Sequence, residues 1–127
     1  MASILLAEDD LSMRSFIQKA LERAGHSVHA EPDGLKALDC LRLQKQGLSS
    51  KVFDLLLTDI VMPGIDGIEL AQKASKLCPE MKVMFITGFS AVAMNAREKK
   101  QDAKILSKPF HLNDLVQQVD VLLEQVA

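Results

Sequence analysis

One apolar run in this chain ends at a carboxylate and is followed almost at once by a turn. The run spans Leu55–Leu57, Thr58 and Asp59 follow it, and a Met-Pro-Gly turn begins at Met62. A segment that is apolar at successive positions indicates a strand buried on both faces, as in parallel sheets. Parallel sheets of this open kind bind ligands at the carboxyl ends of their strands. We therefore expect an α/β protein with Asp59 at a functional edge.

Strand and helix patterns alternate along the chain. Short apolar segments predict five strands, at Ser3–Ala7, Ser27–Glu31, Phe53–Thr58, Lys82–Thr87 and Ala103–Ser107. Apolar residues at helical spacing predict five helices, at Leu11–Ala24, Leu35–Leu43, Gly67–Leu77, Ala91–Lys100 and Leu112–Val126. Phe16, Ile17 and Leu21 share the apolar stripe of the first helix. Such alternation implies right-handed crossovers and a parallel sheet.

Length and composition indicate one domain spanning residues 1–127, and we expect no output domain. The net charge of −2, from 15 basic and 17 acidic residues, argues against a nucleic-acid partner. We expect a cytoplasmic protein, because no apolar run approaches the roughly 20 residues of a membrane span and no signal peptide is evident. Cys40 and Cys78 are expected to be reduced structural residues.

Polar side chains follow four of the five expected strands. They are Glu8, Asp9 and Asp10 after the first strand, Asp59 after the third, Thr87 at the fourth and Lys108 after the fifth. Clustered carboxylates need a cation nearby, and a set of oxygen ligands without His or Cys suits Mg²⁺. A carboxylate with a metal, an ammonium and a hydroxyl is the set required to accept and stabilise a phosphoryl group.

Four motifs in this order resemble the receiver domain of two-component response regulators. They are Leu5–Asp10 (LLAEDD), Thr58–Gly67 (TDIVMPGIDG), Phe85–Gly88 (FITG) and Ser107–Phe110 (SKPF). The resemblance covers the whole chain. It implies a flavodoxin-like (CheY-like), doubly wound fold, with a five-stranded parallel sheet in the order 2-1-3-4-5 and five flanking helices.

The resemblance implies a phosphorelay role for the site residues. Asp59 would accept a phosphoryl group from a histidine kinase or a histidine phosphotransferase. Thr87 would be the switch hydroxyl, and Lys108 would contact the phosphoryl group. The resemblance thus describes a signalling switch rather than an enzyme that turns over an external substrate.

The same resemblance implies a Mg²⁺ site formed by Glu8, Asp9, Asp59 and the backbone carbonyl of Val61. Glu8 stands where the family more often has Asp, and its side chain is one methylene longer. An outer-shell or water-mediated contact of Glu8 with the metal is therefore expected.

Other polar residues have simpler interpretations. Asp10 is expected to be a solvated acid or to cap the helix that follows it, and Asp66 is expected to form a turn rather than bind a ligand. His26, His29 and His111 are interpreted as surface or helix-start residues without a role in ligation or catalysis.

Three further positions bear on the switch and on the lifetime of the phosphoryl group. Ile105 stands where many receivers carry an aromatic residue that rotates inward on phosphorylation. Val61 and Phe89, two residues after Asp59 and Thr87, are apolar and cannot orient an attacking water. We therefore expect slow to moderate self-dephosphorylation, and a phosphoryl lifetime of only seconds would contradict this.

A receiver without an output domain must signal through its own surface, by binding a partner protein in a way that depends on its phosphorylation state. The expected output face is carried by Met94, Arg97, Lys104 and Ile105. Met94 has an equally good interpretation as a core residue.

Three segments resemble more closely the CpdR-type single-domain regulators of alphaproteobacteria. They are Asp54–Ala71, Lys82–Ala93 and Leu106–Val116. That subfamily implies an adaptor that primes a Clp-type protease in its unphosphorylated form. One alternative is a phosphorelay intermediate or phosphate sink without an effector. A haloacid-dehalogenase-type phosphatase is less favoured, because Val61 replaces the second Asp that such an enzyme needs.

Overall fold

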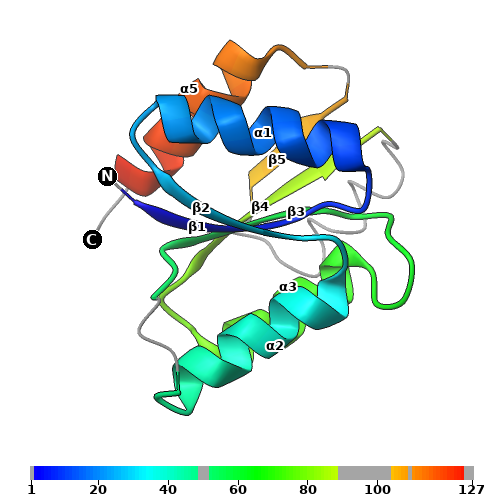
Figure 1. Cartoon of the computed structure of the whole chain (residues 1–127), viewed down its shortest axis with the longest axis vertical. Coiled ribbons are helices and arrows are strands. Elements are labelled where there is room, and N and C mark those ends of the chain that lie inside the picture. The colour runs from blue at the N-terminus through cyan, green and yellow to red at the C-terminus, as the bar shows by residue number, and fades with distance from the viewer. Residues whose placement is uncertain (1, 49–51, 89–103, 109, 125–127) are drawn as a thin grey trace.

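The computed structural model of the chain describes residues 2–48, 52–88, 104–108 and 110–124. Five parallel strands form one sheet in the order β2-β1-β3-β4-β5 (Figure 1). The strands are β1 (Ser3–Ala7), β2 (Ser27–Glu31), β3 (Leu55–Asp59), β4 (Lys82–Thr87) and β5 (Lys104–Ser107). The helices are α1 (Leu11–Arg23), α2 (Gly34–Lys45), α3 (Gly67–Leu77) and α5 (Leu112–Glu124).

The predicted architecture is confirmed, with small differences at the ends of elements. β3 begins two residues later than expected and includes Asp59, and α2 extends one residue further at its start and two at its end. The helix expected at Ala91–Lys100 lies outside the described residues. The sheet order is the one that the receiver resemblance implied.

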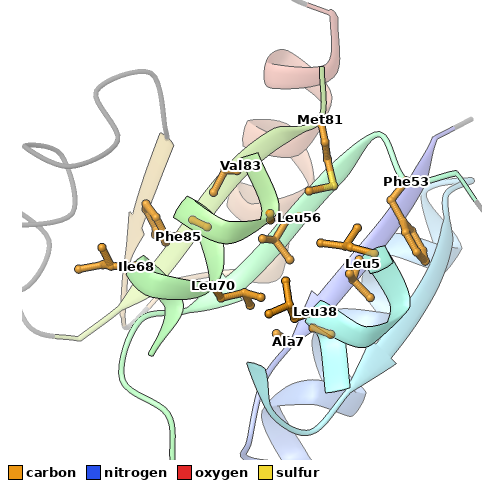
Figure 2. Close-up of a cluster of buried hydrophobic side chains, with 14 of the residues drawn as sticks. Leu5, Ala7, Leu38, Phe53, Leu56, Ile68, Leu70, Met81, Val83 and Phe85 are labelled. Carbon is orange, nitrogen blue, oxygen red and sulfur yellow. The ribbon is translucent and has the colours of Figure 1, made fainter. Parts of the chain in front are cut away.

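The helices form one layer on each side of the sheet. Figure 1 shows α1 and α5 over one face, and α2 and α3 over the other. Side chains of β3 alternate between the two layers: Leu55 and Leu57 join the core beneath α1 and α5, whereas Leu56 joins the core beneath α2 and α3. Figure 2 shows the second of these cores, with Leu56 among the buried side chains. The continuous apolar run of this strand is thus explained by burial on both faces.

Two apolar residues of the predicted helix stripes are not in the core. Phe16 is 59% exposed, and Leu35 at the start of α2 is also exposed. The expectation that Phe16 shares the buried stripe of Ile17 and Leu21 is therefore wrong. The sheet beneath α1 is covered by Ile17 and Leu21, which leaves Phe16 at the side of the helix.

Aspartate residues cap the N-termini of three helices in the described part of the chain. Asp10, Asp33 and Asp66 each accept a hydrogen bond from a backbone N–H three residues later, at 2.8 Å in every case. These contacts confirm the expected capping role of Asp10, and Asp66, which was expected in a turn, caps α3. Gly25, after α1, has a φ of +98°, a conformation that glycine adopts without strain.

No helix within the described ranges combines the length and the apolar character that a membrane crossing requires.

Candidate functional site

The carboxyl ends of β1, β3, β4 and β5 bring four polar side chains to one edge of the sheet. Ala7 pairs with Thr58, Asp59 with Ile86, and Thr87 with Ser107, so the residues at or just after these pairs lie side by side. The parallel register therefore gathers Glu8, Asp59, Thr87 and Lys108, as the sequence predicted. Glu8 is fully buried, Asp59 is 7% exposed, and Thr87 is buried.

Lys108 joins the two buried carboxylates. Its Nζ lies 2.8 Å from Asp59 Oδ2 and 3.4 Å from Glu8 Oε1. The backbone N–H of Lys108 donates to the Thr87 carbonyl at 2.7 Å, which fixes the start of the loop after β5 next to the end of β4. The ammonium is thus held between both acids by contacts of its side chain and its backbone.

The electrostatics of this edge show an excess of negative charge. Burial, followed by repulsion from Asp59, raises the pKa of Glu8 from 4.5 to about 7, although Lys108 acts in the opposite direction. Burial lowers the pKa of Lys108, but its hydrogen bond to Asp59 and the two negative charges outweigh this effect and raise it above 10.5. One ammonium therefore does not neutralise the cluster.

Oxygen atoms at this edge are placed to share a cation. Glu8, Asp9 and Asp59 each offer one carboxylate oxygen, and these oxygens lie within 4.8 Å of one another. Asp9 is exposed, whereas the other two acids are buried. Carboxylate oxygens open to water on one side suit Mg²⁺, which retains several waters when it binds. The donor set therefore fits Mg²⁺, and a contact from the Val61 carbonyl remains a prediction.

The start of α3 approaches the end of β3 closely. The Gly67 N–H donates to the Ile60 carbonyl at 2.8 Å. A Cβ at Gly67 would collide with the Asp59 carbonyl oxygen, and it would lie 2.9 Å from both the Asp59 carbonyl carbon and the Ile60 Cα. Glycine at this position therefore allows the helix to pack directly behind Asp59.

An apolar groove adjoins this edge, and sequence reasoning missed it. It has a volume of about 510 Å³ and is lined by Met13, Phe16, Lys108, Phe110 and Leu112. Lys108 belongs both to the groove and to the acidic cluster. An exposed phenylalanine is not distinguishable in sequence from one that completes a buried stripe, so no signal in the chain predicted the groove.

The residues of the expected output face are only partly described. Met94 and Arg97 lie outside the described residues, as does Phe89. Lys104 is exposed, and Ile105 is half-buried against the core beneath α2 and α3.

The expected surface position of the histidines is confirmed for His111 and is wrong for the side chain of His26. His111 is exposed, and its carbonyl accepts the first hydrogen bonds of α5. The side chain of His26 is only 8% exposed, and its Nε2 lies 2.7 Å from Asp120 Oδ1 on α5. Its Nδ1 accepts a hydrogen bond from the Ala2 N–H at 3.2 Å. His29 is half-buried beside Glu31.

Comparison with known proteins agrees with this geometry. Residues 4–120 match the response regulator receiver domain family. The chain is 53% identical over 124 residues to the response regulator receiver protein CpdR of Brucella abortus, covering 97% of this chain and 98% of CpdR. It is 35% identical to the sensor kinase CckA of the same organism over 98% of this chain, which corresponds to 13% of that longer protein.

Solved structures of receiver proteins also match this chain. A response regulator receiver protein from Sinorhizobium medicae superposes with a TM-score of 0.84 at 30% identity, covering 98% of this chain and 95% of that chain. The receiver domain of the hybrid histidine kinase CckA superposes with a TM-score of 0.77 at 30% identity, covering 95% of this chain and 98% of that domain.

Proposed function

Because the chain belongs to the response regulator receiver domain family, we propose that Asp59 is its phospho-acceptor and that phosphorylation switches its binding to a partner protein. The observation that supports this most directly is the environment of Asp59. Its carboxylate is almost fully buried at a strand end, 2.8 Å from the ammonium of Lys108 and within reach of two further acids. A carboxylate with further acids for a metal and with an ammonium is the set that can accept and stabilise a phosphoryl group.

The proposed transfer is a displacement at phosphorus. One Asp59 oxygen attacks the phosphorus of a phosphohistidine, the P–N bond breaks, and an acyl phosphate forms while the imidazole leaves with a proton from water. A carboxylate has two oxygens, so Lys108 can hold one while the other forms the new bond. Thr87 ends the neighbouring strand and would donate its hydroxyl to a phosphoryl oxygen.

Receiver domains bind Mg²⁺ at an acidic pocket, and the residues present fit that ion. Glu8, Asp9 and Asp59 would hold it, together with the Val61 carbonyl. Bound there, Mg²⁺ would supply positive charge that offsets the phosphoryl oxygens. Lys108 would contribute the remaining charge at the same oxygens.

We propose that the phosphoryl donor docks on the apolar groove beside Lys108. Met13 and Phe16 on α1, Phe110 before α5 and Leu112 at the start of α5 line it, and Lys108 belongs both to the groove and to the acidic cluster. A histidine kinase or a histidine phosphotransferase must present its phosphohistidine at this edge. An apolar surface bordering the pocket would bury against the donor protein while the transfer occurs.

Replacing Phe16 with Ala is expected to slow transfer from a histidine phosphotransferase at least about fivefold, because an exposed aromatic anchor is worth about 1 kcal/mol or more. Phosphorylation by acetyl phosphate needs no docked protein and should be unchanged. Both rates can be followed on phosphate-affinity gels. Leu43→Ala, which also truncates an exposed apolar side chain but on α2, is the matched control. Equal slowing with both donors would contradict a docking role.

We propose that the domain signals by binding a partner protein on its own surface. It would act in the cytoplasm as an adaptor that controls a Clp-type protease. The similarity to CpdR over 98% of that protein supports a stand-alone receiver of the same kind. Met94, Arg97, Lys104 and Ile105 are the proposed contact residues, of which Lys104 is exposed in the described part of the face. The proposed role is that of a signalling switch and not of an enzyme that turns over an external substrate.

A second candidate is a phosphorelay intermediate, which the similarity to the receiver domain of CckA favours. An intermediate or phosphate sink would pass the group from Asp59 back to a histidine phosphotransferase and would have no effector. Mixing the phosphorylated chain with such a phosphotransferase and following the label separates the two functions. Rapid back-transfer with no state-dependent effector would favour the intermediate.

The proposed switch can be tested by affinity capture from a cell extract. Wild type and Asp59→Asn are compared, each with and without beryllofluoride and Mg²⁺, which together mimic the acyl phosphate. We expect wild type to change its partners on treatment, with the unfoldase of a Clp-type protease bound only in one state. The Asn variant should not respond. Identical partners in all four samples would contradict the switch.

A further inference from the structure

The edge strand β2 carries two polar side chains on a face that α2 covers. Val28 and Ala30 pack on the opposite side, against the core beneath α1 and α5. Because side chains alternate along a strand, His29 and Glu31 point together toward α2. The centroids of the His29 and Phe53 rings lie 6.2 Å apart. His29 and Glu31 are only half-buried. A strand face under a helix is ordinarily apolar, so this pair requires an explanation.

Cys40 on α2 completes a three-residue cluster. Glu31 Oε2 lies 2.7 Å from His29 Nε2 and 3.4 Å from Cys40 Sγ, and one ligand atom of each residue lies within 4.8 Å of the others. The Cys40 thiol donates to the carboxylate. The three side chains come from two elements, and nitrogen, oxygen and sulfur atoms converge at one point.

We propose that His29, Glu31 and Cys40 form a binding site for a zinc-class transition-metal ion. This set includes the ligand types that zinc prefers, whereas Mg²⁺ avoids sulfur and nitrogen. Ligands about 2.0–2.3 Å from a tetrahedral ion lie about 3.3–3.8 Å apart. The Cys40–Glu31 distance already falls in that range, and the His29–Glu31 pair needs to open by less than about 1 Å.

Binding at this site has a defined proton balance. Cys40 must lose its thiol proton to become a thiolate, and His29 Nε2 must be without a proton to donate its lone pair. One proton is released from the thiol to the solvent, and a second is released if the imidazole was charged. Three protein ligands leave a fourth position for water, as in open zinc sites. The bound ion would join β2 to α2 at the edge of the sheet.

Cobalt provides a spectroscopic test on the full chain. Co²⁺ is added to reduced protein in excess Mg²⁺, which occupies the oxygen-only pocket around Asp59. We expect one equivalent of Co²⁺ to bind with a thiolate-to-cobalt charge-transfer band, and Zn²⁺ to displace it. Cys40→Ser should abolish the band, and Glu31→Gln should weaken Co²⁺ binding at least tenfold.

Cys78→Ser is the matched control, because Cys78 packs against the same core but its Sγ accepts a hydrogen bond from Gln44 Nε2 at 3.2 Å. Burial raises the pKa of the Cys78 thiol, which disfavours thiolate formation there. This variant should keep the band. Loss of the band in Cys78→Ser, its survival in Cys40→Ser, or no band in wild type would overturn the proposal. Far-ultraviolet circular dichroism of each variant separates loss of the site from loss of the fold.

Discussion

Asp59→Asn is expected to reduce incorporation of a phosphoryl group from acetyl phosphate to the background level. The amide that replaces the carboxylate carries no negative charge and forms no stable acyl phosphate. The change is nearly isosteric, and its oxygen can still accept a hydrogen bond from Lys108, so the fold should persist. It also removes one of the two buried charges that repel each other, those of Asp59 and Glu8. Intact mass spectrometry in the presence of Mg²⁺ measures the result.

Asp54→Asn is the matched control for this experiment. Asp54 precedes the same strand at its opposite end, where its Oδ2 accepts a hydrogen bond from the Ser3 N–H at 2.8 Å. An Asn side chain can keep that contact, so phosphorylation of this variant should equal that of wild type. Wild-type labelling of Asp59→Asn, or loss of labelling in Asp54→Asn, would show that the acceptor lies elsewhere.

Gly67→Ala is expected to destabilise the domain by about 3 kcal/mol, at the upper end of the usual cost of overpacking. The added methyl group meets buried backbone of Asp59 and Ile60, not the end of a flexible side chain, so α3 must shift away from the sheet. A loss of this size lowers the melting temperature by about 10 °C in a domain of this length. Urea unfolding followed by circular dichroism gives the free energy directly.

Gly88→Ala tests whether this effect is specific to the site of contact. A Cβ at Gly88 would lie 3.8 Å from the Lys108 Cβ, which is ordinary van der Waals contact. The free energy of unfolding of this variant should differ from wild type by less than about 1 kcal/mol. Ala also lowers the conformational entropy of the unfolded chain, which offsets part of any loss. Similar losses in both variants would mean that the close approach at Gly67 does not determine the stability difference.

The parts of the fold that sequence predicted are those governed by local pattern. Lys82–Thr87 and Gly67–Leu77 have the predicted bounds, because a turn or a Pro marks their ends and their apolar periodicity is clear. The sequence pattern also predicted that Glu8, Asp59 and Lys108 lie close together, because each follows or ends a predicted strand and parallel strands place their carboxyl ends on one edge. The receiver resemblance then supplied the strand order, which periodicity alone does not determine.

Features that sequence did not predict depend on contacts between distant residues. His26 contacts Asp120, which lies 94 positions away, and no local pattern indicates that partner. Phe16 is exposed, whereas its neighbours on the stripe, Ile17 and Leu21, pack in the core beneath α1 and α5. The approach of Cys40 to His29 and Glu31 likewise depends on where α2 settles against the edge strand.

The contacts of Lys108 also bear on the order of events during synthesis of the chain. Its partners Glu8 and Asp59 precede it by 100 and 49 positions, so both acids leave the ribosome long before their shared cation. The nascent chain must carry these acids without their partner until β5 is added. The ion pairs of Lys108 with Glu8 and Asp59 can therefore form only once the fifth strand has joined the sheet, so the acidic edge stays without this countercharge until then.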